Sequence, residues 1–357
     1  MRFVRYRVIR HPGAGDNGHL DVPSMPRLGL QFDQGPDGRG GWILPLDALP
    51  GLNDDADRSR AMDDGDLAAY LEADGDLVAA RSGLSDLPDP SPSRLPAASV
   101  RLLAPVHRPG KIVCVGYNYR DHASEHDRAS TQARPEPDRP LLFAKWANAV
   151  VGDGDPVIHS DVTHALDLEA ELAVVIGARA RRVPESLALG YVAGWTAVND
   201  VTARDLQGMD PALRPGEHGD GQWVRAKSSD TFLPMGPAMV TLDEMPDVSN
   251  LAIRSWRTPA DGEPVQMQDG RSGNLIFVVP RLIAFICGSV SLEPGDIIAT
   301  GTPSGVGVFR DPPMFLAPGD IVSVEVSGIG RLDNPVVAAD GSVPRGSAAA
   351  AILMSAR

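Results

Sequence analysis

Residues 167–177 read Asp-Leu-Glu-Ala-Glu-Leu-Ala-Val-Val-Ile-Gly, an acidic half followed by an apolar half. Its second half is an apolar, β-branched run that ends in glycine, which predicts a buried strand. Its first half carries three carboxylates, where a core strand should carry none. Side chains two residues apart on a strand point to the same face, so we expect Glu169 and Glu171 to project toward one spot.

Two neighbouring carboxylates raise each other's pKa unless a cation lies between them. Mg²⁺, Mn²⁺ and Ca²⁺ prefer oxygen ligands, so the pair is a candidate metal site. A second strand-like run, within residues 193–207, ends at Asp200, which would supply a third carboxylate if the two strands lie side by side. The alternatives are a solvated acidic strand edge and an Asn199–Asp200 cap for a helix that begins near Thr202.

Composition bounds the class of protein. The chain has 357 residues, 43% of them hydrophobic, which allows one large or two ordinary domains with a sizeable core. Its net charge of −14 argues against sequence-independent nucleic-acid binding. It has neither a run long enough to span a bilayer nor the apolar region of a signal peptide, so we expect a cytoplasmic protein. Cys114 and Cys287 lie in apolar runs and are expected to be buried free thiols.

The chain divides into three parts by composition. Residues 1–99 combine short strand-like pieces, a helical pattern near residues 67–80 and a Pro- and Ser-rich linker at 87–96, which predicts a small N-terminal α+β domain. We find no catalytic constellation there and expect a role in packing or subunit contact. Residues 100–337 would form the main domain, and 338–357 a flexible tail.

His122 and Glu125 are three residues apart in a stretch with helical spacing, so their side chains can touch. A carboxylate beside an imidazole makes a competent general base for water. The alternative is an ordinary surface pair on a helix. Residues 126–140 are polar and proline-rich, which predicts a loop, and this loop could close over substrate as a lid.

Several blocks of the chain, in order, resemble the fumarylacetoacetate hydrolase family. They are Lys-Ile-Val-Cys-Val-Gly-Tyr-Asn-Tyr-Arg-Asp-His-Ala-Ser-Glu (111–125), the Glu-x-Glu of 169–171, Asn-Asp-Val-Thr-Ala-Arg-Asp-Leu-Gln (199–207), Lys-Ser-Ser-Asp-Thr-Phe-Leu-Pro-Met-Gly-Pro (227–237) and Pro-Gly-Asp-Ile-Ile-Ala-Thr-Gly-Thr-Pro-Ser-Gly-Val-Gly (294–307). The resemblance covers roughly residues 101–337. It implies an α+β, mostly β fold: a mixed β-sandwich roll preceded by a small N-terminal α+β domain.

The resemblance also implies roles for individual residues. The metal ligands would be Glu169, Glu171 and Asp200, holding Mg²⁺ or Mn²⁺, with Ca²⁺ possible in crystals. The catalytic residues would be His122, Glu125 and Lys227. The substrate-binding residues would be Tyr119, Arg204, Gln207 and Thr302. From the residues alone, Arg204 and Lys227 could equally be surface charges, and 301–307 a plain tight turn. A homodimer is expected from the resemblance only.

Two departures from the family pattern bear on the pocket. Trp146 stands where the family usually has proline after lysine, and we expect it to reshape one wall of the pocket. Residues 255–263 replace the family's Val-Asn-Gly-Glu turn with a longer hairpin.

The expected function is a divalent-metal-dependent hydrolase that cleaves a carbon–carbon bond in an acylpyruvate or related β-diketo acid, through an enolate held by the metal. The His122–Glu125 pair favours hydrolysis. The alternatives are a β-keto acid decarboxylase or a keto–enol isomerase or tautomerase of the same family, acting on oxaloacetate or a 2-hydroxyhepta-2,4-diene-1,7-dioate type of substrate. A non-catalytic metal or small-molecule binding protein is a further alternative. In each case the partner is a small keto acid, not a nucleic acid or a membrane.

Overall fold

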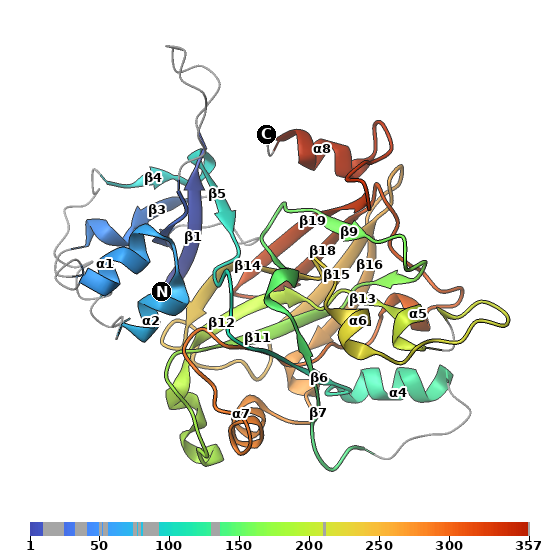
Figure 1. Cartoon of the computed structure of the whole chain (residues 1–357), viewed down its shortest axis with the longest axis horizontal. Coiled ribbons are helices and arrows are strands. Elements are labelled where there is room, and N and C mark those ends of the chain that lie inside the picture. The colour runs from blue at the N-terminus through green and yellow to red at the C-terminus, as the bar shows by residue number, and fades with distance from the viewer. Residues whose placement is uncertain are drawn as a thin grey trace.

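The computed structural model describes residues 1–9, 25–32, 41–49, 52, 56–73, 77, 80, 93–129, 136–209 and 212–355. Within these residues the structure is dominated by two β-sheets, with short helices around them (Figure 1). The predicted α+β, mostly β class is therefore confirmed.

The larger sheet has twelve strands, and its main path runs β4-β3-β2-β1-β14-β12-β11-β17-β6-β7. Its strands are β1 (Arg2–Val8), β2 (Arg27–Phe32), β3 (Trp42–Pro45), β4 (Leu95–Pro96), β5 (Val100–Leu103), β6 (Ile112–Gly116), β7 (Leu141–Lys145), β8 (Val150–Val151), β11 (Ala170–Ile176), β12 (Val192–Asn199), β14 (Leu233–Thr241) and β17 (Ile297–Ala299). Every residue of β11 is buried, because strands flank it on both edges and its side chains face the core on both sides. The predicted strand is confirmed.

The smaller sheet has five strands in the order β16-β15-β18-β19-β9. They are β9 (Val157–His159), β15 (Ala252–Thr258), β16 (Val265–Arg271), β18 (Ile321–Val326) and β19 (Gly330–Ala338). A short separate pair joins β10 (Leu166–Asp167) to β13 (Thr202–Ala203). Strands β11, β12 and β14 pack against β15, β18 and β19, and apolar side chains such as Leu172, Trp195 and Val324 fill the core there. Two sheets packed in this way form the expected sandwich.

Seven α-helices lie around the sheets in the part of the chain that the structure describes. They are α1 (Ala56–Asp63), α2 (Leu67–Glu72), α4 (Arg120–Ala129), α5 (Arg204–Gln207), α6 (Trp223–Lys227), α7 (Val279–Cys287) and α8 (Ala348–Ser355). Short 3₁₀ segments occupy Leu46–Ala48, Ala97–Ser99, Ala147–Ala149, Glu185–Tyr191, Ser272–Asn274 and Gly307–Phe309. Among the described residues, none of these helices has the length and apolar character needed to cross a membrane. Cys114 and Cys287 are buried free thiols, as predicted.

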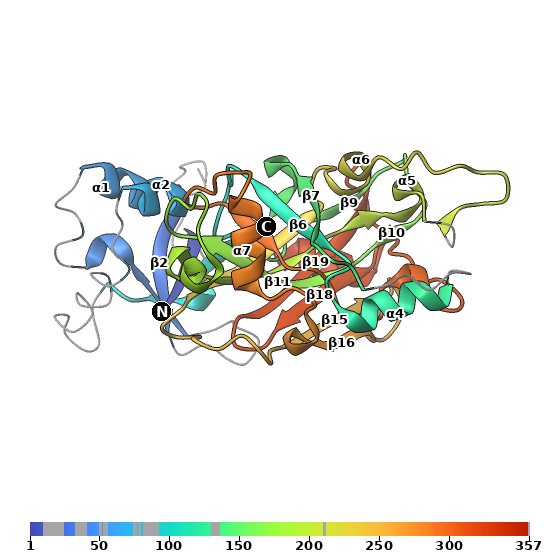
Figure 2. The same ribbon diagram turned by 90° about the horizontal axis from the view of Figure 1, so that it is seen from below.

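The N-terminal strands extend the larger sheet rather than forming a sheet of their own. Strand β1 pairs with β14, with Phe3 opposite Met239, and also with β2 and β5. Helices α1 and α2 lie at this end, and α4 lies at the opposite end of the long axis (Figure 2). The proposed boundary at residue 99 thus falls inside one hydrogen-bonded sheet. Most of the expected linker at 87–96 lies outside the described residues, and its end, Leu95–Pro96, forms β4.

The segment after Val337, expected to be flexible, contains helix α8. The backbone N–H of Ala349 donates to the carbonyl of Gly319 at 3.1 Å, and that of Ala348 to the carbonyl of Ala260 at 2.9 Å. Ala349 itself is fully buried. A run of alanines has the highest helix propensity and the smallest side chains, so it forms a helix that fits closely against these turns.

Candidate active site

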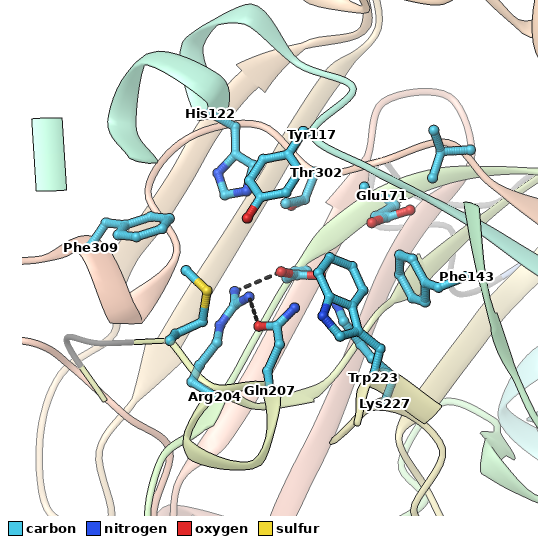
Figure 3. A pocket seen from close by; sticks show the side chains of 14 residues that line it. Tyr117, His122, Phe143, Glu171, Arg204, Gln207, Trp223, Lys227, Thr302 and Phe309 are labelled. Atoms are coloured by element: carbon cyan, nitrogen blue, oxygen red, sulfur yellow. Dashed lines mark hydrogen bonds and ion pairs between the residues drawn. The ribbon is translucent and has the colours of Figure 1, made fainter. Parts of the chain in front are cut away.

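A pocket open to solvent lies where β6, β11, α4, α5 and α6 meet the loop after β17 (Figure 3). Fourteen residues line it: Val115, Gly116, Tyr117, His122, Phe143, Glu169, Glu171, Arg204, Gln207, Met209, Trp223, Lys227, Thr302 and Phe309. They come from segments almost two hundred residues apart and include most of the residues singled out from the sequence.

Three carboxylates lie together at the pocket: Glu169 and Glu171 line it, and Asp200 adjoins them without belonging to the lining. Glu169, Glu171 and Asp200 each offer an oxygen atom within 4.8 Å of the others, and all three side chains are buried. The antiparallel pairing of β11 with β12 brings them together, because Ala170 lies opposite Asn199 and the start of one strand meets the end of the other. The backbone N–H of Asp200 donates to the carbonyl of Glu169 at 2.9 Å, which fixes this register.

The capping alternative for Asp200 is wrong. Helix α5 begins at Arg204, its N-cap is Ala203, and no side chain caps it. The Asp200 carboxylate instead faces two lysines: Nζ of Lys145 lies 2.6 Å from Oδ1, and Nζ of Lys227 lies 2.7 Å from Oδ2. The side chain thus belongs to a buried ionic cluster.

Lys227 also contacts Glu169, with Nζ 2.5 Å from Oε2. Burial alone would lower the pKa of Lys227, but the charges of Asp200 and Glu169 raise it above its ordinary value. Lys227 is therefore a protonated ammonium at neutral pH. It is buried in the pocket wall and is not a surface charge.

Arg204 is held by carboxylates on two sides. Its Nε donates to Oδ2 of Asp167 at 2.8 Å, and its Nη2 lies 2.6 Å from Oε1 of Glu169. Its Nη1 donates to Oε1 of Gln207 at 3.1 Å (Figure 3). Burial would raise the pKa of Glu169, but the charges of Arg204 and Lys227 lower it to about 2. Glu169 is thus ionised in the folded protein.

Glu171 has a different environment. Its Oε2 accepts a hydrogen bond from the backbone N–H of Gly301 at 2.8 Å. Burial and the nearby charges of Asp200 and Glu169 hold the pKa of Glu171 well above its ordinary value. Repulsion among the three carboxylates is therefore only partly balanced by the protein's own cations.

The donor set fits a hard divalent cation. Four buried carboxylates, those of Asp167, Glu169, Glu171 and Asp200, face three buried cations, those of Lys145, Arg204 and Lys227. A divalent ion with oxygen ligands would supply the missing positive charge.

His122 and Glu125 form a pair at the mouth of the pocket. Nδ1 of His122 lies 3.2 Å from Oε2 of Glu125, and their side chains are 8% and 11% exposed, so this is not an ordinary surface pair. The backbone N–H of Gly305 donates to both oxygens of Glu125, at 3.0 and 3.2 Å. The ring of Tyr117 stacks beside His122, and that of Phe309 lies 5.8 Å away between centroids. Helix α4 ends at Ala129, and residues 130–135 of the proposed lid lie outside the described part.

The loop after β17 closes one side of the pocket, so it is more than a plain turn. The hydroxyl of Thr302 donates to the carbonyl of Ala170 at 3.0 Å and accepts a hydrogen bond from Nε2 of Gln268 at 2.7 Å. Gly301 has a φ of +101° and Gly305 a φ of +106°, conformations that side-chain-bearing residues rarely adopt. These glycines let backbone N–H groups approach the Glu171 and Glu125 carboxylates.

Two aromatic residues differ from expectation. Tyr119 is fully buried and lies outside the lining, whereas Tyr117 lines the pocket. The backbone of Tyr117 has a positive φ of 53°, which breaks the alternation of strand β6 and changes which tyrosine faces the pocket. Trp146 is 60% exposed and does not line the pocket, whereas Phe143, three residues earlier, does. The hairpin at 255–263 contributes no lining residue either.

Three supporting residues were not predicted to belong to the site: Lys145, Asp167 and Gln268. Asp167 accepts N–H bonds from Gly307 and Val308 at 2.8 and 3.1 Å, so it joins the loop to Arg204. Its signal was present, since it is the first of the three carboxylates in residues 167–177. The sequence does not show which cations these carboxylates meet.

Comparison with known proteins agrees with this architecture. The family model described as fumarylacetoacetate (FAA) hydrolase C-terminal matches residues 111–337. Human "Oxaloacetate tautomerase FAHD2A, mitochondrial" is 39% identical over 339 residues, which cover 94% of this chain and 92% of that protein. A Xenopus laevis oxaloacetate tautomerase is 38% identical over 318 residues, covering 89% and 88%.

Solved structures give the same result. The fumarylacetoacetate hydrolase from Exiguobacterium antarcticum has a TM-score of 0.66 at 30% identity, covering 94% of this chain and 99% of that one. The 5-carboxymethyl-2-hydroxymuconate delta-isomerase from Mycobacterium smegmatis has a TM-score of 0.63 at 29% identity, covering 95% and 99%. Sequence, fold and site together show that the chain belongs to the fumarylacetoacetate hydrolase family.

Proposed function

We propose that this chain is a metal-dependent keto–enol tautomerase of β-carbonyl 2-oxo acids, with oxaloacetate as the reference substrate. The observation that carries the proposal is the match, over almost the whole chain, to proteins named oxaloacetate tautomerases. A structural neighbour is likewise named as an isomerase. These relatives favour the isomerase alternative over the hydrolase that the sequence favoured.

The three carboxylates of Glu169, Glu171 and Asp200 would hold Mg²⁺ or Mn²⁺, the hard cations that their oxygen atoms suit. When bound, such a cation supplies a Lewis acid that polarises carbonyl oxygens and makes the neighbouring C–H bond more acidic. Arg204 and Gln207, which line the pocket next to this cluster, would hold the substrate carboxylate through their N–H donors.

His122 is the proposed base. Its Nδ1 faces Glu125, so the tautomer with a proton on Nδ1 donates to that carboxylate and leaves the lone pair on Nε2. Nε2 can take the proton from the carbon between the two carbonyl groups. The electron pair of the broken C–H bond then forms the carbon–carbon double bond, and the carbonyl π pair moves to oxygen.

Lys227 is the proposed partner of that oxygen. As a buried ammonium it donates hydrogen bonds, and it would stabilise the negative charge that develops when the C–H bond breaks. Protonation of the oxygen gives the enol, and protonation of the carbon by His122 regenerates the keto form. Neither direction requires water to add to carbon.

The test follows the loss of the ultraviolet absorbance of enol oxaloacetate with Mg²⁺ or Mn²⁺, against the rate without protein. We expect acceleration that disappears with a chelator and falls strongly in His122→Ala. His159→Ala is the matched control, because His159 lies in β9 and does not line the pocket. Equal rates with and without the wild-type protein, or a rate that chelator leaves unchanged, would contradict the proposal.

Hydrolysis is the second candidate, and the His122–Glu125 pair supports it. The same imidazole could take a proton from water, so that hydroxide adds to the acyl carbonyl of an acylpyruvate. Cleavage of the carbon–carbon bond then gives a carboxylic acid and pyruvate. Acetylpyruvate would yield acetate and pyruvate if this reading is right. Oxaloacetate tautomerisation without pyruvate release from either substrate would exclude both hydrolysis and decarboxylation.

A homodimer and a cytoplasmic location stay predictions. The name of the human relative places that protein in mitochondria. Light scattering coupled to size-exclusion chromatography measures the oligomeric state, and cell fractionation measures the location.

A further inference from the structure

The walls of the pocket are unusually aromatic for this chain. Phenylalanine, tyrosine and tryptophan make up 5% of the sequence, yet four of the fourteen lining residues are of these types. They are Tyr117, Phe143, Trp223 and Phe309, and Met209 adds a further apolar surface. The proposed proton transfers need a base, a donor and a carboxylate holder, and they leave these side chains without a role.

The aromatic side chains form two groups. Tyr117 and Phe309 flank His122, with centroid distances of 6.2 and 5.8 Å to its ring. Phe143 and Trp223 form an edge-on pair at 5.3 Å, and the Phe143 centroid lies 4.9 Å from Nζ of Lys227. In the view of Figure 3, Phe309 and Phe143 lie on opposite sides, with Arg204 and Gln207 between them. The polar floor is thus bordered by two aromatic walls.

The cations of the pocket are already engaged by carboxylates. Arg204 faces Asp167 and Glu169, and Lys227 faces Glu169 and Asp200. They can contact one substrate head group at the floor. Among the described lining residues, no further lysine or arginine lies on the walls to meet a second carboxylate. A charged group against these walls would lose its hydration without an ion pair in return.

We propose that the pocket prefers 2-oxo acids whose far end is a planar, uncharged group, such as an aryl or conjugated alkenyl substituent, over those that end in a second carboxylate. This preference rests on the proposed function, since it assigns the substrate class of the same site. The enol of such a substrate is conjugated with its substituent and therefore flat. A flat group can lie against aromatic faces and edges, which attract each other beyond the burial of apolar area.

The preference can be measured by binding alone, with three oxamates that share one head group. N-phenyloxamate carries a planar ring, N-cyclohexyloxamate an apolar ring that is not planar, and N-oxalylglycine a carboxylate. None has a C–H bond between two carbonyl groups, so none can undergo the proposed reaction. We expect calorimetry with Mg²⁺ present to give N-phenyloxamate a Kd about tenfold lower than that of N-oxalylglycine, with N-cyclohexyloxamate between them.

Substitutions in the two aromatic walls test whether these side chains cause the binding preference. Trp223→Leu and Phe309→Leu should each bring the ratio of the phenyl and carboxylate Kd values closer to one. Trp146→Leu is the matched control, because this tryptophan is exposed and outside the lining, and it should keep the wild-type ratio. Two wall variants are used so that one misfolded protein does not decide the result.

Two outcomes would overturn the preference: N-oxalylglycine binding as tightly as N-phenyloxamate, or N-cyclohexyloxamate binding as tightly as the phenyl compound. The expected order of affinities in a protein that does not tautomerise oxaloacetate would contradict the proposed function and support the preference. Tautomerase activity together with tighter binding of N-oxalylglycine would support the proposed function and contradict the preference.

Discussion

The ammonium nitrogen of Lys145 lies 2.6 Å from Oδ1 of Asp200, and both side chains are fully buried. Burial lowers the pKa of Lys145, and the charge of Asp200 opposes that shift. Lys145 also donates to the backbone carbonyl of Val201 at 3.1 Å. It thus fixes the end of β12 and the orientation of one candidate metal ligand from beneath the pocket.

Removal of the Lys145 side chain should destabilise the folded protein. We expect Lys145→Met to lower the free energy of unfolding by about 3–5 kcal/mol, because it leaves the buried Asp200 short of one partner. Urea denaturation followed by tryptophan fluorescence measures the change. Arg254→Met is the control: this arginine pairs with Asp269 at 3.0 Å near the surface, and its loss should cost less than about 1 kcal/mol. Equal losses in the two variants would show that Lys145 does not stabilise the cluster.

Glu171 should make the effect of Mg²⁺ depend on pH. Its folded-state pKa is raised above 4.5 by burial and by Asp200 and Glu169, so the metal-free folded state holds a proton that the unfolded state has lost. The free energy of unfolding of the metal-free protein should therefore fall as pH rises from 4.5 toward the raised pKa of Glu171. A bound cation would replace the proton, so the Tm increase caused by Mg²⁺ should grow as pH rises above the ordinary value of 4.5.

Glu171→Gln is the variant that checks this explanation. It stays neutral at every pH, so the Mg²⁺-induced Tm increase should be smaller and should lose its pH dependence. A wild-type Tm increase that is the same across the range would contradict the assignment of Glu171 as a ligand. Glu169 behaves in the opposite way: with a pKa of about 2, its contribution to stability is lost only as pH falls from about 4.5 toward 2.

The carboxylate cluster was predictable from the sequence because it depends on local rules. Alternation along the stretch that leads into β11 places Glu169 and Glu171 together, and the neighbouring strand β12, which ends one residue before Asp200, brings in the third group. Alternation does not predict Lys145, and it does not show which cation Asp167 meets. Their partners, Asp200 and Arg204, lie 55 and 37 residues away, and only the packed sheets show which charges meet.

The aromatic lining was harder to predict for a related reason. Strand alternation stops at Gly116, and the positive φ of Tyr117 redirects the chain, so Tyr119 turns into the core. The pairing of the N-terminal strands was likewise not predictable from the local sequence. Their sequence pattern predicted strands correctly but did not reveal that β1 hydrogen-bonds to β14, more than two hundred residues later.

His122 and Glu125 should affect the chemical step more than metal binding. We expect His122→Ala to lower kcat by about 10²–10⁴-fold, the usual contribution of a general base. Glu125→Gln should lower kcat by a smaller factor, because the amide keeps an oxygen that can accept a hydrogen bond from Nδ1–H of His122 and orient the ring. The Kd for Mn²⁺, measured by calorimetry, should change little in both variants, since neither residue belongs to the three-carboxylate cluster. A large loss of Mn²⁺ affinity in His122→Ala would place the imidazole among the ligands instead.

Gly305 connects the loop after β17 to the proposed base. A Cβ atom at this position would lie 2.1 Å from the carbonyl oxygen of Met267, and the backbone has a φ of +106°. Gly305→Ala must therefore move the loop, and the N–H that holds Glu125 moves with it. We expect kcat to fall by about 10-fold to 100-fold, because a slightly displaced base loses its alignment with the substrate.

Gly341→Ala separates that effect from backbone strain. Gly341 also has a positive φ, of +80°, but its added Cβ would meet nothing within 4 Å. This control should lose about 1–3 kcal/mol of stability from strain alone and keep the wild-type kcat. If Gly305→Ala also keeps the wild-type kcat when folded, the hydrogen bonds from Gly305 do not position Glu125. A selective fall in kcat would instead mean that the close backbone approach allowed by glycine is part of how His122 is oriented.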